Sequence, residues 1–136
     1  MKIKRIEHVA IAVRDMKLAQ NIFGNLGIET DYEETIGTVR LAMLPIGESA
    51  VEFIQPLERG SKLDNSIEQN GEGLHHICLE VDDIESALAE LKAKGIGLVD
   101  QTPRTGHGNS RIAFIDRAFT SNVLVELVEL PKAGHD

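Results

Sequence analysis

Two histidines and two glutamates occupy matching places in the 136-residue chain, and their side chains could bind a metal ion together. His8 and His76 lie in similar apolar stretches, and Glu52 and Glu126 lie in two similar apolar runs. Neutral imidazole and carboxylate suit a divalent ion such as Co, Ni, Mn or Zn, and four such ligands leave two octahedral positions open for a chelating substrate. Any one of these residues alone would more often be a hydrogen-bonded core histidine or a solvated glutamate. The matched set of four is what favours a metal site.

An internal repeat places these residues. The segment Ile6–Met16 matches the segment Leu74–Ile84, with a histidine at the same position in both and an aspartate one residue before the end of each. After each segment, apolar residues at helical spacing predict an amphipathic helix. A carboxylate should cap the start of each helix, and a left-handed glycine should end it. The expected caps are Asp15 and Asp83, and the expected glycines are Gly27 and Gly95.

Each copy continues with three strand-like runs that are bounded by turn residues. These runs are expected at 28–35, 38–45 and 49–55, and again at 96–100, 110–116 and 122–130. The repeating unit is therefore βαβββ, which predicts an α+β fold whose tandem units form a cupped, barrel-like mixed β-sheet with helices outside. We expect a single domain, 1–136, made of modules 3–55 and 73–130. The connection at 56–72 should contain a short helix at 66–69.

Strand alternation predicts which way the four residues point. His8 should lie on the face opposite the bulky β-branched residues that cover the helix, and His76 should do the same in the second copy. Glu52 and Glu126 are flanked by apolar residues that take the helix face, so each glutamate should share a face with a histidine. A buried carboxylate needs a partner, which the histidine or a shared cation would supply.

Two arginines are candidates for binding an acidic substrate. Alternation along 38–45 predicts that Arg40 enters the cavity, and Arg111 holds the corresponding place in the second copy. Two guanidinium groups would suit a carboxylate or a phosphate, and ordinary solvated or ion-paired arginines explain the pattern nearly as well. The loop at 106–108 is either a lid over the substrate or a flexible hairpin connection.

The composition disfavours several classes of function. With 14 Lys and Arg against 22 Asp and Glu, the net charge of −8 disfavours nucleic acid and anionic membranes as partners. The one cysteine, Cys78, cannot form an internal disulfide, and no apolar run is long enough to span a bilayer. We therefore expect a cytoplasmic protein with a small-molecule ligand. An acidic ligand would need a local basic pocket.

Over residues 3–130 the paired units resemble the vicinal oxygen chelate superfamily, which includes glyoxalases, bleomycin-resistance proteins and dioxygenases. The stretches EHVAIAV at 7–13, GLHHICLEVDDI at 73–84 and VLVEL at 123–127 look like its methylmalonyl-CoA epimerase branch. The resemblance implies an isomerase that interconverts (R)- and (S)-methylmalonyl-CoA, an acyl thioester. The reaction is α-proton abstraction and reprotonation through an enolate that one divalent metal ion stabilises. It also implies a homodimer.

By this resemblance, Glu126 is a metal ligand that also acts as one base, and a second base must act on the opposite face of the enolate. Some family members carry a glutamate on the third strand. The matching position in this chain is expected to be Arg40, which cannot act as a base because its pKa exceeds about 12. Glu52 or a water molecule on the metal would then serve instead.

Two other functions are compatible with the same pattern. A glyoxalase I-like lyase would act on a thiol hemithioacetal with the same four ligands. A non-catalytic small-molecule binding protein would need the cavity but no metal. A ring-cleaving dioxygenase is disfavoured, because its iron triad would leave one of the four positions unused.

Overall fold

The computed structural model describes residues 1–132, which fall into two compact units. The first unit is His8–His75, and the second unit joins Met1–Glu7 to the chain from His76 onward. Residues 133–136 of the predicted domain lie outside the described part of the chain. The arrangement of modules 3–55 and 73–130 within one domain stays a prediction.

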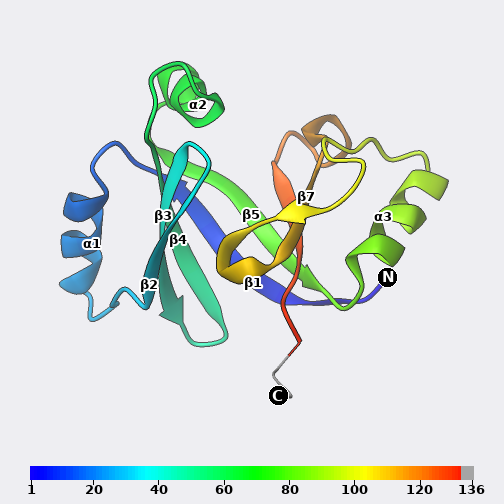
Figure 1. The fold of residues 1–136 in the computed structure, drawn as a ribbon, viewed down its shortest axis with the longest axis horizontal. Coiled ribbons are helices and arrows are strands. Elements are labelled where there is room, and N and C mark those ends of the chain that lie inside the picture. Colours follow the sequence, from blue (N-terminus) through cyan, green and yellow to red (C-terminus); the bar gives the residue numbers. More distant parts are fainter. Residues whose placement is uncertain (133–136) are drawn as a thin grey trace. The chain divides into compact units, whose positions relative to one another are not determined.

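The first unit contains a four-stranded sheet and two helices (Figure 1). Its elements are β1 (Ile3–Ala12), α1 (Met16–Gly24), β2 (Tyr32–Ile36), β3 (Val39–Ile46), β4 (Ser49–Pro56) and α2 (Lys62–Asn70). The first half of β1 belongs to the second unit, because the boundary falls after Glu7. The strand order is β2-β3-β4-β1, in which β1 and β4 are parallel and the other pairs are antiparallel.

Both faces of this sheet are packed. Helix α1 covers one face, where the Phe23 and Phe53 rings meet edge to face with their centroids 4.9 Å apart. Helix α2 covers part of the other face through Leu63 and Ile67, which pack on residues from β1, β3 and β4. The central strands are therefore apolar on both sides, as expected of strands buried on two faces.

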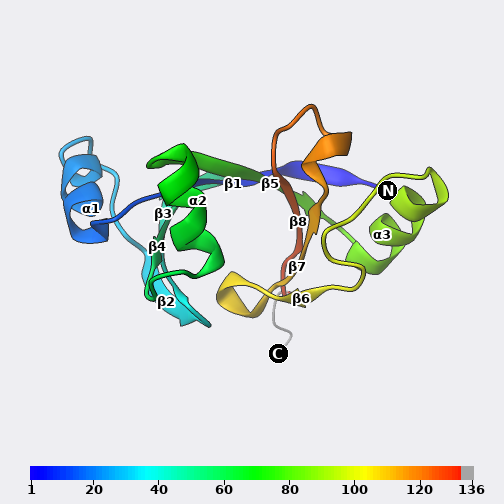
Figure 2. The same cartoon turned by 90° about the horizontal axis from the view of Figure 1, so that it is seen from above.

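The second unit repeats the pattern with one long helix. Besides the first half of β1, its elements are β5 (Gly73–Val81), which enters this unit at His76, α3 (Ile84–Ala93), β6 (Arg104–Thr105), η1 (His107–Asn109), β7 (Arg111–Ile115), η2 (Arg117–Phe119) and β8 (Val125–Glu129). The strand order is β1-β5-β8-β7-β6, with β5 and β8 parallel (Figure 2). Ile84, Leu88 and Leu91 of α3 pack against the face of the sheet that carries Ala113 and Leu127.

The helix signals predicted from the sequence are present. The Asp15 carboxylate accepts the Leu18 N–H at 3.0 Å, and the Asp83 carboxylate accepts the Ser86 N–H at 3.1 Å. Beyond the two helices, Gly27 and Gly95 have φ angles of 81° and 76°, which glycine adopts at little cost. Equivalent local signals therefore begin and end the helix in each copy.

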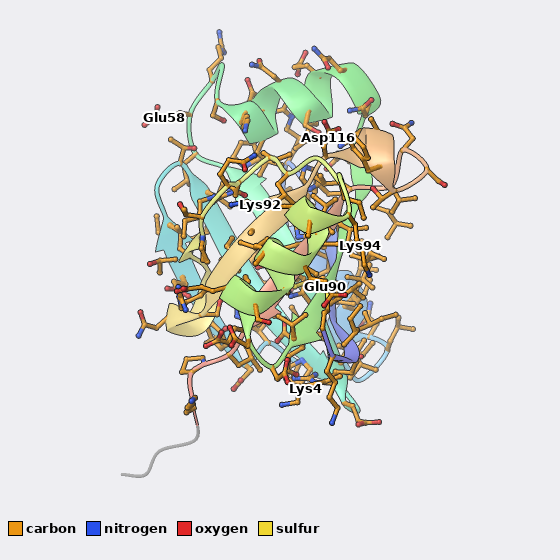
Figure 3. The ribbon with its side chains drawn as sticks, turned by 90° about the vertical axis from the view of Figure 1, so that its right-hand side faces the viewer. Lys4, Glu58, Glu90, Lys92, Lys94 and Asp116 are labelled. Atoms are coloured by element: carbon orange, nitrogen blue, oxygen red, sulfur yellow. The ribbon has the colours of Figure 1, made fainter. Side chains whose placement is uncertain are left out.

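The outer face of α3 is charged (Figure 3). Lys94 pairs with Glu90 at 3.0 Å, and Lys92 Nζ donates to the Gln101 carbonyl at 2.8 Å. Hydrogen bonds from the N-terminal ammonium group and from Lys94 lower the pKa of Glu90 from its usual value. The polar side of this amphipathic helix thus faces away from the sheet, as its sequence pattern predicts.

The predicted α+β fold of tandem βαβββ units with a mixed sheet is confirmed, and two local predictions need correction. The strand expected at 96–100 is reduced to a single bridge between Leu98 and Ile115, because the Asp100 carboxylate takes the Phe114 N–H at 2.8 Å. The short helix expected at 66–69 is the longer α2, which Ser61 caps by accepting the Asp64 N–H. Within residues 1–132, no helix is long and apolar enough to cross a membrane.

Candidate active site

In the first unit, His8 and Glu52 meet on the sheet face that α1 does not cover. Ala10 of β1 lies opposite Glu52 of β4 in the parallel register, and His8 precedes Ala10 by one alternation. The neighbouring Phe53 points the other way, into the core under α1. His8 Nε2 lies 3.2 Å from Glu52 Oε1, and both side chains are buried.

The second unit forms an equivalent pair from His76 on β5 and Glu126 on β8. Nε2 of His76 lies 3.0 Å from Oε1 of Glu126, and both residues are buried. Phe114 on β7 lies opposite Glu126 in the strand register, and its ring meets the His76 ring edge to face at 5.1 Å. The aromatic contact restricts rotation of the imidazole and shields the pair from water.

The donor atoms of each pair fit the coordination of a divalent ion. Two neighbouring ligands of an octahedral ion, each bonded at about 2.1 Å, lie about 3.0 Å apart. The pairs have 3.2 Å and 3.0 Å between nitrogen and oxygen. Oε1 of Glu126 lies within ion-pair distance of His76 Nε2, so both donor atoms point to one place. A His–Glu set in each unit could therefore hold a metal.

The expected position of Arg40 is wrong. In the β3–β4 register, Met43 is opposite Glu52, whereas Arg40 is opposite Gln55, whose side chain accepts the Met16 N–H at the start of α1. Arg40 therefore lies on the α1 side, where it donates to Glu33 at 3.0 Å and is part-exposed. The alternation could not show this, because both faces of β3 are buried and both are apolar.

Arg111 needs the same correction. It alternates with Ile112, so it shares the face of β7 on which Ala113 packs against α3. Its guanidinium group pairs with Glu85 in the first turn of α3, and this hydrogen bond raises the pKa of Arg111. Both arginines thus belong to the helix-covered sides of their sheets. They give no support to the predicted basic pocket.

A buried pair in the second unit was not predicted from the sequence. His107 Nε2 hydrogen-bonds Oε1 of Glu7 at 3.0 Å, and each residue is 7% exposed. Glu7 stands next to His8, and alternation alone would have assigned it to the helix face. The sequence signal for His107 was only its place between two glycines, which indicated a loop and did not indicate that its side chain is buried.

Ser110 was also missed. It is 1% exposed, and its hydroxyl oxygen has no hydrogen-bond partner within residues 1–132. A buried hydroxyl without a partner costs about 1–3 kcal/mol, so such groups commonly mark a place where a ligand or water binds. Ser110 directly precedes β7, one alternation away from Ile112, whose side chain packs with Cys78 and Val128.

Another polar cluster in the first unit lies at the start of α2. The Gly60 N–H donates to Asp64 at 2.7 Å, and Arg14 donates to the same carboxylate. These two contacts lower the pKa of Asp64 from its ordinary value. An open cavity of about 160 Å³ is lined by Arg14, Pro56, Leu57, Glu58, Arg59 and Asp64, and it contains none of the four predicted metal ligands.

Comparison with known proteins places the chain in a defined group. Residues 7–114 match the Glyoxalase/Bleomycin resistance protein/Dioxygenase superfamily. The Bacillus subtilis protein YqjC is 35% identical over 92% of this chain and 91% of its own length. Mitochondrial methylmalonyl-CoA epimerase of Dictyostelium discoideum is 32% identical over 93% of this chain and 79% of its own. A variant of Streptomyces coelicolor methylmalonyl-CoA epimerase, solved with 2-nitronate-propionyl-CoA, has a TM-score of 0.93 at 29% identity, covering 99% and 100% of the two chains.

Proposed function

Because the chain belongs to the Glyoxalase/Bleomycin resistance protein/Dioxygenase superfamily, we propose that it is an isomerase that epimerises methylmalonyl-CoA. The observation that carries the proposal is the pair of buried His–Glu contacts, one in each unit, in a chain similar along nearly its whole length to epimerases of that substrate. The reaction exchanges the hydrogen at C2, the carbon between a thioester carbonyl and a carboxylate.

In this proposal, His8, Glu52, His76 and Glu126 ligate one divalent ion, with Co, Ni, Mn and Zn as candidates. The repeat supports this assignment, because each copy independently brings one imidazole nitrogen to one carboxylate oxygen. When bound, the ion supplies a Lewis acid for the two substrate oxygens, which acidifies the hydrogen at C2.

The chain's own residues supply proton transfer and exclude water. Glu126 takes the proton from C2, or returns it, from one face of the substrate. Cys78, Ile112 and Val128 form a buried cluster, with Phe114 packed against it, on the side of the second unit that carries His76. This apolar surround lowers the local dielectric, which strengthens each electrostatic interaction with the developing enolate charge.

Ser110 is the residue of the second unit best suited to hold a substrate oxygen. Its hydroxyl is buried without a partner among the described residues, and a carboxylate or carbonyl oxygen would accept its proton. The tight turn from His107 to Ser110, closed by a hydrogen bond of 3.0 Å from the Ser110 N–H to the His107 carbonyl, fixes the position of this hydroxyl. A donor held in this way orients the substrate.

Hydrogen exchange at C2 of methylmalonyl-CoA in D₂O tests the proposal. The protein loaded with each candidate metal should incorporate deuterium and interconvert the epimers, and a chelator should stop both processes. Absence of exchange with every metal, accompanied by turnover of a hemithioacetal, would identify a lyase instead. Stoichiometric binding of methylmalonyl-CoA by the metal-free protein without exchange would identify a binding protein.

Elemental analysis tests the metal site separately. One ion per chain is the expected stoichiometry if the two His–Glu pairs share a metal, and two ions per chain would contradict the shared site. The homodimer and the cytoplasmic location expected from the sequence stay predictions, which sedimentation and cell fractionation would check.

A further inference from the structure

We infer that Arg104 binds a phosphate group of the coenzyme A arm of the substrate, and that this contact makes the site specific for a CoA thioester. The inference rests on the proposed function and concerns the part of the substrate that lies beyond the reacting carbon. That part carries several negative charges on its phosphates, whereas the chain itself has a net charge of −8. Such a ligand needs a cation of the protein directed at it.

Arg104 lies on the same face of its sheet as the proposed ligand Glu126. On β6 it is opposite Ile112 of β7. Phe114, one alternation further along β7, is opposite Glu126 of β8. Residues opposite each other in a strand pair point to the same side of the sheet, and so do residues two positions apart in one strand. The face that carries Glu126 therefore continues across β7 to Arg104 on the edge strand β6 (Figure 2).

One aromatic ring connects Arg104 with the proposed metal ligands. The guanidinium carbon of Arg104 lies 5.6 Å from the centroid of the Phe114 ring, which is within cation–π distance. The same ring meets the buried imidazole of His76 edge to face at 5.1 Å. The Arg104 side chain is 52% exposed, so it stands where the buried ligands give way to solvent. Neighbouring strands lie about 4.8 Å apart, and the pantetheine arm is long enough to cross from β8 to β6.

The guanidinium group is held in a way that leaves its terminal nitrogens available. Arg104 Nε donates to Asp100 Oδ1 at 3.0 Å, and the other oxygen of Asp100 accepts the Phe114 N–H at 2.8 Å. The carboxylate is thus fixed to β7 and holds the arginine by one nitrogen. Nη1 and Nη2 have no hydrogen-bond or ion-pair partner within residues 1–132. Two such N–H groups in one plane suit bidentate binding of a phosphate.

The buried hydroxyl of Ser110 is a second, independent sign of a ligand on this hairpin. Ser110 has extended backbone and lies two positions before Ile112, so its side chain shares the Arg104 face. Its oxygen is buried and has no partner in the described part of the chain. A Cβ at Gly106 would come within 3.0 Å of this oxygen, so the glycine leaves the hydroxyl uncovered. The hairpin therefore offers two donors on the face that carries Glu126.

Other cations of the second unit are less suitable. Arg111 lies on the opposite face of the hairpin, where it pairs with an acidic residue of α3. Arg5 and Lys4 both lie against Glu80, at 2.7 Å and 3.6 Å. The lysines of α3 are engaged on its outer face. Arg117 follows β7 at the end away from Ser110 and is the competing candidate, which the test below includes.

Kinetics with three forms of the substrate test the assignment. Wild type and Arg104→Gln are compared on methylmalonyl-CoA, on its 3′-dephospho form and on methylmalonyl-pantetheine, which has no phosphate. The variant should raise KM for methylmalonyl-CoA about tenfold, because a charge-assisted hydrogen bond is lost. KM for the pantetheine thioester, and kcat for all three substrates, should stay within about threefold of wild type. A tenfold loss with the dephospho form assigns Arg104 to the pyrophosphate, and no loss assigns it to the 3′-phosphate.

Three further variants keep the outcomes distinct. Arg104→Lys keeps the charge without the planar fork and should recover part of the loss. Arg111→Gln makes the same change of charge on the other face of the hairpin, and it should leave the preference for CoA over pantetheine unchanged. Arg117→Gln should behave in the same way. An equal loss with the pantetheine thioester in Arg104→Gln, or a loss selective for CoA in Arg117→Gln instead, would overturn the assignment.

Calorimetric titration of metal-free protein separates this inference from the proposed function. Arg104→Gln should bind propionyl-CoA about tenfold more weakly and propionyl-pantetheine unchanged, and the difference should shrink at high salt, which screens an exposed charge. If the wild type epimerises its substrate and the variant binds propionyl-CoA as tightly as wild type, this inference alone fails. If binding depends on Arg104 in this way and the wild type exchanges no hydrogen at C2, the proposed function fails and the phosphate site stands.

Discussion

The two units share one βαβββ pattern and one His–Glu pair, yet the faces around these pairs differ. In the first unit the face of Glu52 carries apolar residues of β1, β3 and β4 that α2 partly covers, and the register also places Tyr32 and Glu34 of β2 on this face. In the second unit the corresponding side holds Cys78, Ser110 and the Glu7–His107 pair, and no counterpart of α2 follows β8 within residues 1–132.

This difference suggests that metal binding uses both copies of the repeat equally, whereas substrate chemistry depends mainly on the second copy. In the proposed metal site each copy supplies the same two ligand types, one histidine and one glutamate. In the proposed function, proton transfer and substrate orientation are assigned to Glu126 and Ser110, which both belong to the second unit. Under this proposal the first unit supplies two ligands, and the second unit supplies two ligands together with the Ser110 hydroxyl that orients the substrate.

The largest expected effect comes from removing a metal ligand in either unit. His8→Ala and His76→Ala should each lower metal affinity by more than about 100-fold and abolish epimerisation, because each removes one ligand of the same ion. Elemental analysis after dialysis and the exchange assay measure this. His75→Ala, a change beside His76 at the opposite alternation, is the control. If only one of the two ligand variants loses metal, the units are not equivalent in binding it.

Core truncations compare the stability of the two units. Phe53→Ala under α1 should cost about 3–5 kcal/mol, and Leu127→Ala under α3 about 2–5 kcal/mol, because each leaves a cavity in a packed core. Urea denaturation followed by circular dichroism measures both losses. A single transition that both changes shift would support the predicted one-domain organisation. Two transitions, each sensitive to one change, would contradict it.

A smaller and opposite pair of effects is expected at Ser110. Ser110→Ala removes a buried hydroxyl without a partner, so the free energy of unfolding should stay within about 1 kcal/mol or rise. The same change should lower kcat/KM for methylmalonyl-CoA about tenfold, since one hydrogen bond to the substrate is lost. Ser66→Ala on α2 is the control for both measurements. A clear loss of stability at unchanged kcat/KM would show that the hydroxyl is structural.

The smallest effect concerns acid stability at α2, which the second unit lacks. Because the folded-state pKa of Asp64 is lowered, the unfolded chain binds this proton more readily, and the contribution to stability is lost as the pH falls below about 4. Asp64→Asn should therefore flatten the dependence of the melting temperature on pH in this acidic range. The exposed change Glu58→Gln is the control. An unchanged pH profile in Asp64→Asn would contradict the role given to Arg14 and Gly60.

Sequence patterns predicted the repeated parts of this protein well. The α+β class, the family, the two helices and their Asp15 and Asp83 caps are confirmed, because capping and amphipathic spacing act locally. Periodicity also correctly paired each histidine with its glutamate. It failed at Arg40 and Arg111, where strands buried on both faces give no alternation from which a direction can be read.

The sequence by itself determined the repeat, the element types and the four residues that could hold a metal, since each depends on residue type and short-range spacing. Only the tertiary structure showed that Arg40 and Arg111 pair with acidic residues near α1 and α3, and that Glu7 meets His107 one hundred positions away. The physical reason is that contacts between distant segments depend on strand register and loop closure, which the pattern within one segment does not encode. The buried Glu7–His107 pair and the buried Ser110 hydroxyl of the second unit could therefore be recognised only in the tertiary structure.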